Sequence, residues 1–168
     1  MAGGGATPGE QRPGELRVVG TSGAREIDLL LDRVGQLVGK RPPRVLQVGS
    51  RTLVADRNVR NWRKLVASRF GPKARFVGLD LVEGANVDCV ADICSDWRTL
   101  KGKLGEEPFD LAICCHVLEH TRHPARAARN IEQALRPGGL AFIAAAWSQA
   151  FHATPDDYWR FSVRDLML

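Results

Sequence analysis

The segment that decides the fold is FDLAICCHVLEHTRHPARAARNIEQALRPGGLAFIAAAW, Phe109–Trp147. It starts with Phe109–Cys115, an almost continuous apolar run that is typical of a strand buried on both faces of a parallel sheet. Leu140–Trp147 is a second apolar run and predicts the next strand. Between the two, Pro124 favours the start of a helix, and the Pro-Gly-Gly of residues 137–139 ends it. The segment therefore predicts a strand–helix–strand unit with a right-handed crossover.

The helix between these strands is expected to bury one apolar face against the sheet. Small and aliphatic side chains recur at helical spacing and are expected to form that face: Ala125, Ala128, Ile131, Ala134 and Leu135. Arg136 would then lie in the last turn, where a cation suits the helix dipole.

The rest of the chain alternates strands with helices. The expected elements are a helix at Ala24–Val38, a strand at Arg44–Val48, a helix at Val59–Phe70, strands at Arg75–Leu81 and Val87–Ile93, a loop or helical turn between Asp96 and Gly105, and a final helix with Ser162 as N-cap and Asp165 at its third position. This alternation predicts an α/β fold with a parallel sheet. Residues 1–16 are rich in Gly and are expected to be a disordered tail, so that the domain would span residues 17–168.

Composition narrows the class of protein further. A chain of 168 residues with 44% hydrophobic and 26% charged residues is expected to form one globular domain. The net charge of +5 permits a nucleic-acid partner, but Lys and Arg are spread along the chain, so nothing beyond charge supports one. The four Cys form no CxxC pair, which favours reduced thiols in the cytoplasm over a structural zinc site. No apolar run approaches a membrane span, and no secretory signal is expected.

Polar residues follow three of the predicted strands. The first strand runs into Gly49 and Ser50, and such a strand–Gly–helix turn lets a nucleotide or phosphate approach the backbone. Asp80 ends the second strand and could accept hydrogen bonds from both hydroxyls of a ribose, the alternative being a turn or capping carboxylate. The cluster His116–His123 follows the strand Phe109–Cys115. Ligands of open α/β sheets bind beyond the carboxyl ends of the strands, so we expect these residues to lie at the opening of one binding site.

Taken together, these segments resemble the class I S-adenosylmethionine-dependent methyltransferases, specifically the type 11 branch. The resemblance rests on RVLQVGSR (44–51), FVGLDL (76–81), VDCVADI (87–93), FDLAICCHVLEHTRHPARAARNIEQALRPGGL (109–140) and a tail, HATPDDYWRFSVRDL (152–166), similar to that of one sub-branch. It implies a Rossmann-like three-layer sandwich with a mainly parallel sheet. About five strands are expected, in the family order 3-2-1-4-5, with the family's last two strands missing.

The resemblance also implies S-adenosylmethionine as cofactor and methyl transfer to an O or N nucleophile of an unidentified substrate, with a small molecule favoured. The residues it implies for cofactor binding are Gly49, Ser50, Asp80, Leu81, Asp92, Ile93 and Cys115. His116 and His120 are the candidate catalytic bases, and each could instead be a structural histidine that hydrogen-bonds a backbone carbonyl. His152 and Tyr158 from the tail could close over the substrate.

The spacing of His116, Glu119, His120 and His123 would gather ligands for a divalent metal on one side of a helical turn. No metal is assigned, because the VLEH motif occurs in relatives that need none and Pro124 limits the helix.

Two alternatives to an enzyme remain open. The first is a non-catalytic Rossmann-like module that serves binding or assembly, and the second is a nucleic-acid-binding protein. The last predicted strand would be an outer strand with unpaired backbone groups. The chain could thus be a C-terminally truncated fragment, a short form, or a domain completed by a partner or by self-association through that strand.

Overall fold

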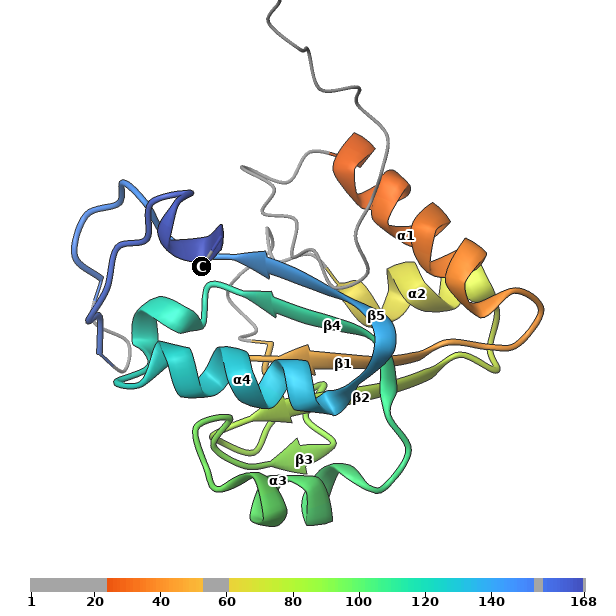
Figure 1. Cartoon of the computed structure of the whole chain (residues 1–168), viewed down its shortest axis with the longest axis horizontal. Coiled ribbons are helices and arrows are strands. Elements are labelled where there is room, and N and C mark those ends of the chain that lie inside the picture. The colour runs from red at the N-terminus through yellow and green to blue at the C-terminus, as the bar shows by residue number, and fades with distance from the viewer. Residues whose placement is uncertain (1–23, 53–60, 153–155, 168) are drawn as a thin grey trace, which may run out of the picture.

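The sheet of this protein is parallel throughout and has five strands in the order β3-β2-β1-β4-β5 (Figure 1). The computed structural model describes residues 24–52, 61–152 and 156–167. The expected disordered tail and the first residues of the helix expected at Val59 lie outside the described residues. The sheet confirms the predicted fold class and the predicted strand order.

The strands and helices have the following bounds. The strands are β1 (Arg44–Val48), β2 (Arg75–Asp80), β3 (Cys89–Val90), β4 (Phe109–Cys115) and β5 (Leu135–Ala144). The helices are α1 (Ala24–Val38), α2 (Trp62–Phe70), α3 (Trp97–Leu104) and α4 (Pro124–Ala134), and two 3₁₀ turns are η1 (Leu118–His120) and η2 (Asp165–Met167).

Helices cover the sheet on both faces, so that the molecule has three layers. The helices α1 and α2 pack on one face of the sheet (Figure 1). On this face Val45, Leu111 and Ile113 are fully buried. The helices α3 and α4 pack on the other face, against Ala112 and Cys114. Alternate residues of β4 thus enter opposite layers, because successive side chains of a strand point to opposite faces. This two-sided burial explains why the strand reads as a continuous apolar run.

The buried face of α4 differs from the predicted one. Ala125 and Ala128 are exposed, and the buried positions are Ala127, Asn130, Ile131 and Ala134. The predicted stripe was wrong in its first turns because alanine occurs on both sides of this helix, so that it marks neither. The predicted face contains only apolar residues and so lacks the polar Asn130.

The start of β5 also differs from the prediction, which placed it at Leu140. Leu135 already pairs with Phe109, and the ladder resumes at Leu140 opposite Leu111 after a shift in register. Residues 136–139 form the bulge between these pairs, so Arg136 is not in the last turn of α4. Its Nε lies 2.7 Å from Oδ1 of the buried Asp110 instead.

Smaller differences concern the ends of elements. The predicted strand Val87–Ile93 contains only the two residues of β3, and β2 ends at Asp80 rather than Leu81. The segment after Asp96 is a helix, and the Asp96 carboxylate caps it by accepting a hydrogen bond from Arg98 N at 3.0 Å. The capping box of Ser162 and Asp165 forms, although the helix behind it is only the turn η2.

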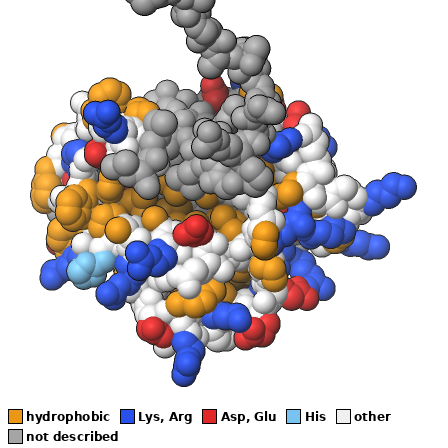
Figure 2. Space-filling model, viewed as in Figure 1, with side chains coloured by type: hydrophobic (Ala, Val, Ile, Leu, Met, Phe, Trp, Pro, Cys, Tyr) orange, Lys and Arg blue, Asp and Glu red, His pale blue; other side chains and the backbone are white. Residues whose placement is uncertain are grey.

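No helix in the described ranges is long and apolar enough to cross a membrane. Figure 2 shows hydrophobic side chains gathered across one side of a molecular face, with Lys and Arg at several places around its rim.

Candidate functional site

The candidate site lies at the carboxyl edge of the sheet, which faces left in Figure 1. Because β1 pairs in parallel with both β2 and β4, the residues that follow these three strands emerge at the same edge. They are Gly49 after β1, Asp80 at the end of β2 and His116 after β4.

The loop after β1 is held tightly against its neighbours. Gly49 has φ +70°, and a Cβ at this position would lie 2.3 Å from Cγ2 of Val117. The backbone N–H groups of Gly49 and Ser50 both donate to the Leu79 carbonyl, at 2.8 and 3.1 Å. The Ser50 side chain is buried and its Oγ has no hydrogen-bond partner among the described residues. Glycine is required here both by the backbone conformation and by the contact with the loop after β4.

Asp80 stands beside this loop. Its Oδ2 accepts a hydrogen bond from Arg51 N at 3.0 Å and its Oδ1 accepts one from Val82 N at 3.2 Å. Because a carboxylate offers about four acceptor positions, both oxygens retain capacity for hydroxyl donors. Leu81, the next residue, is 56% exposed and belongs to the rim of the site.

The loop after β3 is the third segment at the carboxyl edge of the sheet. Asp92 is exposed, and its Oδ1 accepts a hydrogen bond from Cys94 N at 2.7 Å, whereas Ile93 is buried. The Ile93 carbonyl accepts a hydrogen bond from Nδ2 of the buried Asn130 at 2.6 Å, and Ser95 O accepts another at 2.9 Å. The Asn130 side chain of α4 therefore holds the loop after β3 at two of its carbonyls.

The end of β4 is the fourth segment at this edge. Cys115 is half-buried in the last position of the strand, and His116 has φ +54°, a left-handed conformation that non-glycine residues rarely adopt. His116 is mostly exposed, and its Nδ1 lies 3.2 Å from Oε1 of the fully buried Glu119.

The His116–Glu119 contact shifts both groups. The hydrogen bond to Glu119 raises the pKa of His116, against the opposing effect of burial. Burial opposes ionisation of Glu119, but the hydrogen bond from His116 and the nearby positive charge hold the pKa of this carboxyl below its usual value. The pair thus favours a carboxylate that orients an imidazole.

The tail after β5 folds back over η1. Tyr158 N and Trp159 N both donate to the Glu119 carbonyl, at 2.8 and 3.3 Å, and Trp159 Nε1 donates to Thr121 O at 2.9 Å. This brings the ring of His152 to 5.0 Å from the ring of His120, centroid to centroid, in a T-shaped arrangement.

The residues predicted for the site lie at the carboxyl ends of β1, β2, β3 and β4 or in the loops that follow these strands. His120 and His152 meet across the tail, whereas the phenol of Tyr158 accepts from Arg122 Nε at 2.9 Å and donates to Asp156. His123 is exposed, just before α4.

Three residues of this region had no role in the sequence-based prediction: Asn130, Asp157 and Arg160. The pairing of Asp157 with Arg160 connects residues at a spacing of three, which the sequence could have suggested. The contact of Asn130 with the loop after β3 spans 37 positions and left no local pattern.

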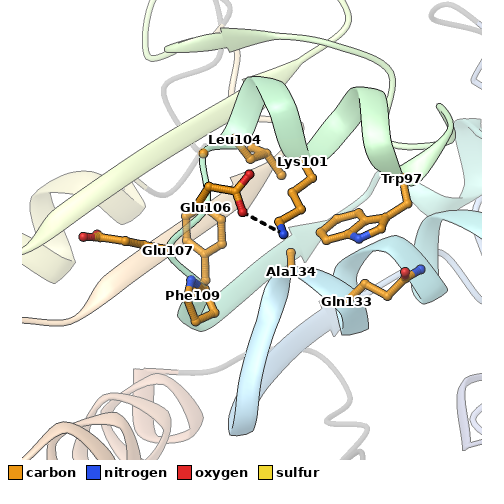
Figure 3. Close-up of a pocket in the computed structure, with 10 residues that line it drawn as sticks. Trp97, Lys101, Leu104, Glu106, Glu107, Phe109, Gln133 and Ala134 are labelled. Carbon is orange, nitrogen blue, oxygen red and sulfur yellow. Dashed lines mark ion pairs between the residues drawn. The ribbon is translucent and has the colours of Figure 1, made fainter.

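A separate pocket lies at the opposite, amino-terminal end of β4 (Figure 3). It is lined by the ends of α3 and α4 and by Phe109, and Lys101 Nζ and Glu106 Oε2 form an ion pair of 2.7 Å beside it. None of the predicted site residues lines this pocket. It is therefore not the candidate site.

Comparison with known proteins adds the following. In the solved structures, the chain is similar to the [4+2]-cyclase SpnF, with 20% identity and a TM-score of 0.51 over 95% of this chain and 62% of SpnF. It is also similar to the methyltransferase MycE of the mycinamycin biosynthetic pathway, solved with Mg and SAH, with 21% identity and a TM-score of 0.48 over 70% of this chain and 32% of MycE. No curated protein matches the chain.

The chain thus spans less than two thirds of the length of these solved proteins. The likeness to SpnF shows the fold. The methyltransferase-domain family matches residues 22–165, which is most of the chain. The protein therefore belongs to the methyltransferase-domain family.

Proposed function

We propose that this protein transfers a methyl group from S-adenosylmethionine to an O or N nucleophile of a small molecule. The observation that carries the proposal is the position of Asp80. Its carboxylate stands at the tip of β2, beside the glycine turn of β1, at the carboxyl edge of a sheet from the methyltransferase-domain family. This is the place at which open α/β sheets bind their ligands.

The donors and acceptors at this edge fit the cofactor. Asp80 would hold the ribose hydroxyls, since each of its oxygens accepts only one of the hydrogen bonds described above. Asp92 and the buried Ile93 would flank the adenine. Leu81 would contact it from the rim.

The end of the cofactor that reacts would lie between β1 and β4. Gly49 and Ser50 would face the methionine part, and Cys115 would lie beside the sulfonium. The bound cofactor supplies the methyl group on a positively charged sulfur. In-line displacement then depends on how well the protein aligns the acceptor and excludes water.

His116 and His120 are the candidate bases for the acceptor proton. Glu119 binds Nδ1 of His116, which fixes the ring and directs Nε2 away from the buried carboxylate. Nδ1 of His120 is bonded to the carbonyl of Asp156, which leaves Nε2 without a proton in the neutral ring. A base in this position would assist an acceptor hydroxyl or ammonium group.

Calorimetric titration of the 168-residue chain with S-adenosylmethionine and S-adenosylhomocysteine tests the proposal. We expect saturable, micromolar binding that Asp80→Ala weakens by at least tenfold. Asp80→Asn retains an acceptor for Arg51 N and separates loss of charge from loss of loop structure. Asp28→Asn, on an exposed position of α1, is the matched control and should bind normally. Normal binding by both Asp80 variants would contradict the ribose assignment.

One observation favours a second candidate, a non-catalytic module of the same fold. The N–H groups of Gly49 and Ser50 are both used by Leu79 O, and Val117 packs onto Gly49, so this turn offers few backbone donors to a ligand. Absence of cofactor binding by the folded chain would favour this candidate.

The cysteine content supports a place in the cytoplasm. All four thiols are buried or half-buried, as expected for a protein kept in a reducing compartment. For partners, the outer strand β5 supports self-association. For a nucleic-acid partner, the net charge of +5 is the only support.

A further inference from the structure

A cluster of three potential metal ligands lies at the point where the tail covers η1. Glu119 and His120 come from η1, and His152 comes from the tail. One ligand atom of each side chain lies within 4.8 Å of those of the other two. The cluster differs from the one considered from spacing alone, because His152 replaces His116 and His123. No sequence spacing could have paired residues 120 and 152.

The hydrogen-bond partners of the two imidazoles leave Nε2 as the nitrogen available to a metal. Nδ1 of His120 contacts the backbone carbonyl of Asp156, and Nδ1 of His152 lies 3.1 Å from Oδ2 of Asp157 and 3.2 Å from Ala150 O. Since these partners only accept hydrogen bonds, both neutral rings carry their proton on Nδ1, and Nε2 keeps its lone pair. Metal-binding histidines are held in this way, with the second nitrogen donating to a carbonyl or carboxylate.

Asp157, which contacts Nδ1 of His152, is itself held in place by hydrogen bonds. The Asp157 side chain is fully buried, and its Oδ2 accepts a hydrogen bond from Arg160 at 2.6 Å and another from His152 N at 3.0 Å. The His152 side chain is 36% exposed, which leaves a route from solvent to its ring.

The carboxylate of Glu119 is an independent observation that points to a missing partner. The side chain is 0% exposed, and Oε1 is bonded to His116. The second oxygen, Oε2, is buried and has no hydrogen-bond partner among the described residues. A buried carboxylate oxygen without a donor is costly, and a bound cation would remove this cost.

We propose that Glu119, His120 and His152 bind one divalent transition-metal ion of the zinc type. Two imidazoles and one carboxylate suit Zn²⁺, Co²⁺ or Fe²⁺ better than Mg²⁺ or Ca²⁺, which prefer oxygen ligands alone. At metal–ligand bonds of about 2.0–2.2 Å and tetrahedral angles, ligand atoms lie about 3.3–3.6 Å apart, so that the three side chains would draw together around the ion.

Three protein ligands leave a coordination position for water or for a substrate hydroxyl. The proposed metal binding does not depend on the proposed function. Only the role of that open position, which would be to hold and acidify the methyl acceptor, rests on the proposed function. In this arrangement His120 is a ligand, and His116 remains the candidate base.

The test uses the full chain, stripped with a chelator and equilibrated with Zn²⁺ or Co²⁺. Elemental analysis should give one metal per chain, and bound Co²⁺ should show visible absorption without the strong near-ultraviolet bands of thiolate ligation. His152→Ala and Glu119→Gln should each weaken binding by more than about 100-fold, the upper end of what loss of a supporting hydrogen bond costs. Asp157→Asn should weaken it less.

The matched control is His123→Ala, since His123 lies in the same cluster of histidines but outside the three-residue site. It should bind one equivalent, as should Cys94→Ser. Circular dichroism of each variant, with His152→Asn as a substitute if His152→Ala unfolds, keeps the result interpretable.

Failure of the stripped chain to bind one metal, or binding that survives both His152→Ala and Glu119→Gln, would overturn the proposal. Cofactor titration of the stripped protein is a separate readout. It distinguishes failure of the metal site from failure of the proposed methyl transfer.

Discussion

Arg136 and Asp110 join the turn after α4 to the start of β4, with Nε of the arginine 2.7 Å from Oδ1 of the aspartate. The aspartate is 1% exposed and also contacts the guanidinium of Arg41 and accepts a hydrogen bond from Arg44 N at 2.8 Å. A single buried carboxylate thus holds the turn after α4, β1 and β4 together at the end of the sheet opposite the candidate site.

Replacing Asp110 with Asn should lower the free energy of unfolding by about 1–3 kcal/mol at pH 7, because the guanidinium groups of Arg41 and Arg136 lose their buried counter-charge. Burial opposes ionisation of Asp110, but its bonds to Arg41 and Arg44 N hold its pKa below the usual value. The contribution of the Asp110 carboxylate to the free energy of unfolding is therefore complete above the unfolded pKa of about 3.9. It is lost as the pH falls through the lower pKa of the folded state.

Urea unfolding between pH 7 and pH 3 measures this effect. The difference between the wild type and Asp110→Asn should stay constant down to about pH 4 and shrink below it. Asp28→Asn, at an exposed position of α1, is the control and should show little change. A difference that grows on acidification would show that Asp110 is not stabilised as its anion.

Replacing Gly49 with Ala should destabilise the protein for two reasons that can be separated. The positive φ costs about 1 kcal/mol for a residue with a Cβ, and the contact with Val117 adds overpacking of about 1–3 kcal/mol. Gly39→Ala is the matched control, since Gly39 has φ +63° and no atom within 4 Å of its added Cβ. It should show the conformational cost alone.

A double-mutant cycle with Val117→Ala checks the second contribution. The double variant Gly49→Ala/Val117→Ala should lose less stability than the sum of the losses in the two single variants. The smaller side chain at position 117 makes room for the new methyl group. Strict additivity in thermal or urea unfolding would mean that the contact is not felt.

Replacing Asn130 with Ala should cost about 1–3 kcal/mol, because the carbonyls of Ile93 and Ser95 lose their shared donor. Faster amide hydrogen exchange at Cys94 and Ser95 should accompany the loss, since the loop after β3 would no longer be fastened to α4. Gln133→Ala, at an exposed position of the same helix, should leave both stability and exchange unchanged.

If the chain associates through the outer strand β5, as proposed, sedimentation velocity should show a concentration-dependent dimer. In the described part of the chain β5 pairs with β4 alone, and Trp147 and Phe151 beyond it are 67% and 74% exposed. Charges at these two positions, Trp147→Glu with Phe151→Glu, should shift the equilibrium toward monomer. Leu29→Glu, at a 60% exposed position of α1, should not. A monomer at all concentrations would contradict this mode of association.

Much of the fold could be predicted because its information is local. The apolar run of β4, the Pro-Gly-Gly turn and the glycine after β1 each reflect a constraint on neighbouring residues, and these constraints gave the order of strands and helices. Predictions failed where two faces of an element carry similar residues, as in α4 with its many alanines. They also failed at Leu135, which enters the ladder through a bulge that no period of two could indicate.

The candidate site divides in the same way. The sequence by itself determined which loops carry it, since a residue that ends a parallel strand must emerge at one edge of the sheet. Only the tertiary structure decided that the tail turns back on η1 and sets His152 against His120, or that Asn130 fastens the loop after β3. These contacts join residues more than 30 positions apart. They depend on the path of the backbone in space, which is fixed by the packing of the whole sheet and its helices.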